Sequence, residues 1–116
     1  MHSGFMGLRS HMPMNMRRPV KERPPTPEAA ADIARIEQAF AGTRAEFGAG
    51  GAFLFGDFSA ADAMFAPVVN RLHVYAAPVA PQTRAYMDAV MALPAWRDWS
   101  AGAAAEPWTI EKFDLL

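Results

Sequence analysis

The segment GDFSAADAMFAP, from Gly56 to Pro67, limits the fold more than any other part of the sequence, because it predicts where a helix begins. Ser59 can accept a hydrogen bond from the N–H of Asp62, and the Asp62 carboxylate can reach back to the N–H of Ser59. This pattern is a capping box with Asp in place of the usual Glu or Gln. A carboxylate in the first turn also suits the positive end of the helix dipole. We therefore expect a helix from about residue 60.

The first twelve residues carry an apolar stripe at helical spacing, formed by Met1, Phe5, Leu8 and Met12. No cap residue precedes this stripe, so it is typical of the end of a helix whose beginning is absent. A truncated reading frame, a fragment and an internal start are three explanations that the sequence does not separate. The charged, proline-rich residues 17–27 that follow predict a connector without a regular element.

The rest of the sequence predicts further helices. Thr26 and Pro27 form a cap and a first helical position, and an amphipathic pattern follows until the glycines after Phe47. The capped helix should extend from about residue 60 to 77 and bend at Pro67. Additional helices are expected over residues 82–93 and from Pro94 onward. Since no strand alternation is found, we predict one all-α domain over residues 1–116, a bundle of about five helices.

Composition excludes several classes of function. The 116 residues contain no Cys, which removes disulfides and thiolate chemistry from this chain. The net charge of -1 argues against a nucleic-acid partner, which usually requires a basic excess. Charged residues interrupt the N-terminal apolar residues, and no segment approaches the length of a membrane span. We therefore expect a cytoplasmic protein with neither a nucleic-acid nor a membrane partner.

Together these features resemble the C-terminal domain of the glutathione S-transferases, especially the bacterial cytosolic ones. The most specific match is the family's loop Gly-Asp-x-Ser-x-Ala-Asp, which leads into the central helix of that domain. Its positions are occupied here by Gly56, Asp57, Ser59, Ala61 and Asp62. The segments MHSGFMGLRSHMPMN and YMDAVMALPAWRDW match the end of the domain's first helix and its later helix pair. One departure is visible, because the residue before the cap, Phe58, would face only Ala63 in the staple position.

The resemblance implies how such a chain acts. In that family a preceding thioredoxin-like domain holds glutathione, the co-substrate, and ionises its thiol. The helical half contributes the pocket for a small hydrophobic electrophile, contacts to the thioredoxin-like domain and part of a homodimer interface. No cofactor is expected on this chain alone, and no catalytic residue. Ser59 and Asp62 are read as a structural capping box, because no His is placed by the sequence to activate Ser59 for hydrolysis.

Four residues are candidates for substrate binding. Phe5 and Met12 are candidates for the electrophile pocket, which the family builds partly from the end of its first helix, although an apolar stripe is more often ordinary core packing. Arg9 is a candidate for holding a carboxylate of glutathione or substrate, with Arg17 and Arg18 as further candidates and solvated surface arginines as the alternative. Trp108 either caps the pocket or closes the core.

No metal site is expected, because His2, His11 and His73 lack the spacing of metal ligands. An alternative function comes from the same resemblance. The helical fold also occurs in translation elongation factor subunits and synthetase complexes as a non-catalytic protein-interaction or scaffolding module. A thioredoxin-like βαβ pattern encoded upstream of Met1 would separate the enzyme from the module.

Overall fold

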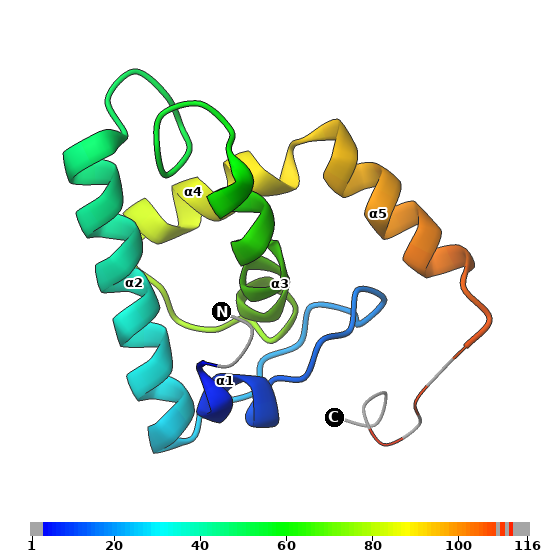
Figure 1. Ribbon diagram of the computed structural model, residues 1–116. Coiled ribbons are helices and arrows are strands. Elements are labelled where there is room, and N and C mark those ends of the chain that lie inside the picture. Colours follow the sequence, from blue (N-terminus) through cyan, green and yellow to red (C-terminus); the bar gives the residue numbers. More distant parts are fainter. Residues whose placement is uncertain (1–3, 109, 111, 113–116) are drawn as a thin grey trace.

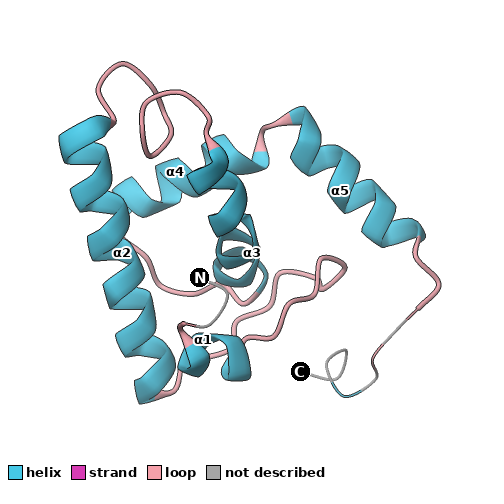
Figure 2. Ribbon diagram, viewed as in Figure 1, coloured by secondary structure: helices cyan, strands magenta, loops and turns pink. Residues whose placement is uncertain are grey.

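The computed structural model describes residues 4–108, 110 and 112, so Met1 and His2 lie outside the described residues (Figure 1). The described residues form five helices: α1 (Met6–His11), α2 (Pro27–Phe47), α3 (Ala60–Val74), α4 (Pro81–Met91) and α5 (Pro94–Ala105). Between α2 and α3 the only sheet-like contacts described are two isolated bridges, Phe53 with Gly56 and Phe55 with Asp57. The predicted all-α class with about five helices is confirmed (Figure 2).

Capping residues mark the starts of the two long helices, α2 and α3. The Thr26 hydroxyl accepts a hydrogen bond from the N–H of Ala29 at 3.2 Å, and Pro27 takes the first position of α2. Helix α3 begins after Ser59 with both parts of a capping box in place. Pro67 lies inside α3, where its missing N–H leaves one backbone carbonyl without its helical partner.

Helix α3 carries much of the core. Its second half is buried, and the described core joins it to residues of α1, α2 and α4. On the α2 side, Phe40 packs against Phe65 and Tyr86 with ring centroids 5.2 and 4.8 Å apart. These long-range apolar contacts fix the angle at which α2, α3 and α4 meet.

Helix α3 ends three residues earlier than predicted. Ala76 has a left-handed backbone with φ 48°. The N–H of Ala77 bonds to the carbonyl of Leu72 at 3.0 Å, and the N–H of Ala76 bonds to that of His73 at 3.1 Å. These two bonds form a Schellman motif, which usually carries Gly at the left-handed position. The sequence did not indicate this helix end, because Ala76 occupies the position where Gly is the usual signal.

The connector is irregular, but it is attached to the C-terminal end of α3. Arg18 is 8% exposed, lies 4.3 Å from the centre of the Tyr75 ring and donates to the carbonyl of Val74. Tyr75 in turn donates its hydroxyl to the carbonyl of Pro13 at 2.7 Å, and Arg71 donates to that of Met12 at 3.0 Å. The reading of Arg18 as a solvated surface residue is therefore wrong.

The N-terminal stripe is built differently from the expected helix end. Phe5 has a left-handed backbone with φ 58°, and α1 begins only after it. Asp32 of α2 accepts the N–H of Leu8 at 3.0 Å, which supplies an acceptor to the first turn of α1. At Gly7 the two helices approach so closely that a Cβ would lie 2.7 Å from the backbone carbon of Glu28. Leu8 and Met12 are buried against this contact.

Helix α5 is the least enclosed element. None of its residues is buried, and it extends away from α2 beyond the end of α4 (Figure 1). Trp96 packs partly against the core. After α5, Arg17 donates to the carbonyls of Glu106 and Trp108 at 2.8 and 2.7 Å. The connector is thereby hydrogen-bonded to the segment 106–108.

Candidate functional site

An apolar hollow lies where α3, the end of α4 and α5 meet, and we call it the α3–α5 hollow. Its volume is about 310 Å³, near the lower limit for pockets that bind small molecules. All of its lining side chains are apolar: Phe58, Ala63, Ala66, Pro67, Val90, Leu93, Ala95, Trp96 and Trp99. A site of this composition can bind an apolar molecule and exclude water. Its side chains offer no hydrogen-bond donor or acceptor beyond the indole N–H groups.

Aromatic rings form much of the accessible wall of this hollow. Trp96 and Trp99 meet edge to face with centroids 5.3 Å apart. Phe58, one residue before the cap of α3, is 50% exposed and meets Phe53 edge to face at 5.7 Å. Ala63 and Ala66 stand opposite without bulky side chains, and this leaves the space open. The Phe58 and Ala63 pair that fails as a hydrophobic staple therefore lines the hollow instead.

The start of α3 is held by Asp62, which is fully buried. Its Oδ2 accepts the N–H of Ser59 at 2.8 Å and the Ser59 hydroxyl at 3.3 Å. Its Oδ1 accepts the hydroxyl of Tyr86 at 2.8 Å and the N–H of Leu54 at 3.2 Å. Burial, followed by the hydrogen bond and charge of Asp62, raises the pKa of Tyr86 above its usual range. These contacts connect the loop that contains Leu54, and Tyr86 of α4, to the start of α3, so the role of Asp62 is structural.

None of the four predicted substrate residues lines the α3–α5 hollow. Met12 has no exposed surface and belongs to the core, so it cannot touch a substrate in this structure. Phe5 packs against the core with the Arg35 guanidinium 5.4 Å from its ring centre, and Arg9 lies within hydrogen-bond reach of the Met6 sulfur. Trp108 is largely exposed after α5.

The sequence carries a signal for the hollow, but that signal is ambiguous. Trp96 and Trp99 are three residues apart on one helix face, a spacing that is also typical of ordinary core packing. What periodicity cannot show is that small alanines of α3 lie opposite these rings. That pairing joins residues about thirty positions apart, so it requires the tertiary structure.

The histidines and carboxylates of the described residues do not form a metal site. Among residues 4–108, 110 and 112, no three His, Cys, Asp or Glu side chains converge as metal ligands would. His11 instead contacts the Pro24 carbonyl at 2.7 Å, and His73 lies 3.5 Å from Arg84. Within the same described residues, no helix has both the length and the apolar character that a bilayer crossing needs.

The five-helix arrangement and its capped α3 define an all-helical domain with an apolar site at one edge. A family profile for the glutathione S-transferase C-terminal domain matches residues 26–102. The chain therefore belongs to the glutathione S-transferase C-terminal domain family, as the capping-box loop indicated. The same comparisons matched no curated protein and no solved structure.

Proposed function

We propose that this chain acts as the helical domain of a glutathione transferase and that the α3–α5 hollow provides part of the pocket for a small apolar electrophile. The observation that carries this proposal is the hollow itself, whose lining side chains are all apolar and include two tryptophans. In the reaction, the glutathione thiolate attacks the electrophilic carbon, a carbon–sulfur bond forms, and a leaving group departs or the electrophile accepts a proton.

This chain would bind and orient the electrophile without activating the thiol. Ser59 and Asp62 are committed to the start of α3, and the hollow presents no carboxylate, imidazole or phenol. Glutathione and the group that ionises it are assigned to a thioredoxin-like domain of the family type. A homodimer and a cytoplasmic location also belong to this proposal. This proposal places the electrophile pocket near the start of α3, and not at the N-terminal stripe that contains Phe5 and Met12.

The proposal is tested with the chain alone and with the chain fused behind a thioredoxin-like domain of the same family. Ala66→Trp fills the hollow, whereas Met64→Trp adds the same side chain to an exposed position of α3 outside it. With a chlorinated nitroaromatic electrophile, the fused protein should conjugate glutathione and the isolated chain should not. Ala66→Trp should raise the KM for the electrophile at least several-fold, with Met64→Trp near the parent value.

The outcomes separate binding from chemistry. Turnover by the isolated chain would show that the thiol is activated by residues of this chain, against the proposal. An unchanged electrophile KM in Ala66→Trp would remove the hollow from the substrate pocket. Replacing Trp108 with Phe leaves Trp96 and Trp99 as the fluorescent reporters, so electrophile binding at the hollow should quench their emission directly.

A second candidate function is the non-catalytic interaction module of the same fold. It is favoured by Phe47 and Phe55, whose rings lie 5.4 Å apart and which are both about half exposed at the tip between α2 and α3. Such adjacent exposed aromatics are typical of contact surfaces. A fused protein that binds no electrophile, together with loss of a protein partner in Phe55→Ser, would favour this module over the transferase.

A further inference from the structure

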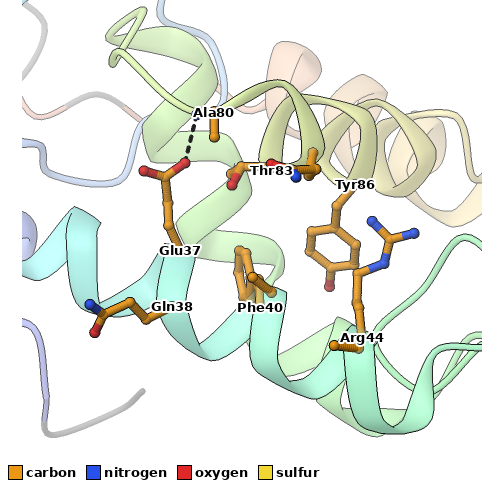
Figure 3. A pocket seen from close by; sticks show the side chains of 10 residues that line it. Glu37, Gln38, Phe40, Arg44, Ala80, Thr83 and Tyr86 are labelled. Carbon is orange, nitrogen blue, oxygen red and sulfur yellow. Dashed lines mark hydrogen bonds between the residues drawn. The ribbon is translucent and has the colours of Figure 1, made fainter.

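A second cavity lies between α2 and the start of α4, away from the α3–α5 hollow. Its volume is about 520 Å³, which is within the range of small-molecule sites (Figure 3). Its floor is aromatic, since Phe40 and Tyr86 lie 4.8 Å apart, and Ala41 and Ala45 leave room above α2. The Tyr86 hydroxyl donates its hydrogen bond to Asp62, so the ring offers the cavity mainly an apolar surface.

Arg44 is the unexplained residue of this cavity. Its Nε is buried and has no hydrogen-bond acceptor in the part of the chain that the structure describes. No carboxylate of those residues pairs with it either. Figure 3 shows its side chain beside Tyr86, and its charge acts on the Tyr86 phenol. A buried donor without an acceptor costs free energy, so its presence calls for a missing partner.

The opposite end of the cavity carries the other sign of charge. Glu37 accepts the N–H of Ala80 at 2.7 Å, just before α4 begins (Figure 3). Seven residues separate Glu37 from Arg44 on α2, which corresponds to about 10 Å along the helix axis. A ligand with one negative group would meet Arg44, while a second negative group at the far end would meet Glu37 and be repelled.

We propose that this cavity binds a small monocarboxylate with a flat apolar body, its carboxylate on Arg44 and its body between Phe40, Tyr86 and the alanines of α2. A carboxylate supplies the acceptor that the Arg44 Nε lacks, and guanidinium and carboxylate form the strong, planar type of hydrogen-bonded pair. This site is separate from the α3–α5 hollow, so it stands whether or not the hollow binds an electrophile.

The test uses the full chain and 3-phenylpropanoate as the probe, with binding followed by NMR shifts of backbone amides. Arg44→Met keeps an apolar stem and removes the charge, and Arg97→Met makes the same change at an exposed position of α5 outside the cavity. We expect the Kd for 3-phenylpropanoate to rise about tenfold or more in Arg44→Met, as loss of a charged hydrogen bond implies, and to stay unchanged in Arg97→Met.

Ligand changes test the same contact without altering the protein. The neutral 3-phenylpropanamide should bind the parent chain at least about tenfold more weakly, and the dicarboxylate phenylsuccinate should gain nothing over the monocarboxylate. In the absence of ligand, Arg44→Met should not lower the Tm, because it removes an unpaired buried donor. Binding that ignores either Arg44→Met or the amide, amide shifts confined to residues outside the cavity, or no binding at millimolar probe would overturn the proposal.

Discussion

Asp62 does more for the structure than a capping residue needs to do. It accepts four hydrogen bonds while fully buried, and two of their donors, Leu54 and Tyr86, lie outside the capping box. The capping pattern predicted the pair with Ser59 because both residues lie within one turn. It could not predict the other two donors, which come from the preceding loop and from α4.

Replacing these two residues should therefore have unequal effects. Ser59→Ala should lower the free energy of unfolding by about 1 kcal/mol, the usual cost of a lost cap. Asp62→Ala should lower it by roughly 3 kcal/mol, because buried donors at Leu54 and Tyr86 also lose their acceptor. Urea unfolding of both variants and of the double variant measures this. Equal costs for the two single variants would mean that the contacts to Leu54 and Tyr86 contribute nothing.

Tyr86 makes stability depend on alkaline pH. Burial and the bond to Asp62 raise its pKa in the folded state above the ordinary value of 10.0, so the unfolded chain gives up this proton first. The folded state then binds more protons than the unfolded state, and the free energy of unfolding falls as the pH rises above about 10. Tyr86→Phe should reduce this fall between pH 9 and 11 in urea titrations. An identical slope in parent and variant would contradict the assignment.

At the scale of elements, the contact between α1 and α2 depends on a glycine. Gly7→Ala would place its methyl group against the backbone of Glu28, so α1 must move away from α2. We expect a loss of roughly 1 to 3 kcal/mol in the free energy of unfolding, as for other overpacked sites. Gly42→Ala in α2 meets nothing within 4 Å and should instead gain up to about 1 kcal/mol. Thermal unfolding followed by circular dichroism compares them, and a neutral Gly7→Ala would show that α1 is not held in this place.

Across the molecule, the sequence predicted helix starts well, and it predicted contacts between distant residues poorly. Thr26 with Pro27 and Ser59 with Asp62 located the starts of α2 and α3, because a cap involves only residues within one turn. The burial of Arg18 could not be predicted, because the Val74 carbonyl that it contacts lies 56 positions further along the chain. The α3–α5 hollow could not be predicted for the same reason, since it joins residues from distant parts of the sequence. The starts of α2 and α3 therefore followed from the sequence, but the end of α3 and the sites between helices did not.

The isolated chain should associate with itself. Leu8 and Met12 of the N-terminal stripe are buried, and Phe5 packs against the core, so these residues offer little surface for association. Large apolar side chains are exposed elsewhere, at Phe47, Phe55, Phe58, Met64 and Trp99. Exposed apolar surface of this extent favours association. Sedimentation at increasing concentration should show species larger than the monomer, and a hydrophobic dye should fluoresce. A monomer at all concentrations that leaves the dye dark would show a self-sufficient domain.

The absence of buried residues in α5 has a consequence for the hollow that it walls. A helix with few buried contacts opens by local unfolding at a much smaller free energy than the rest of the fold. Its amide hydrogens should then exchange with solvent sooner than those of the second half of α3. The hollow is thus walled by the helix for which we expect the smallest free energy of local unfolding, so the hollow should be able to widen while the core stays folded.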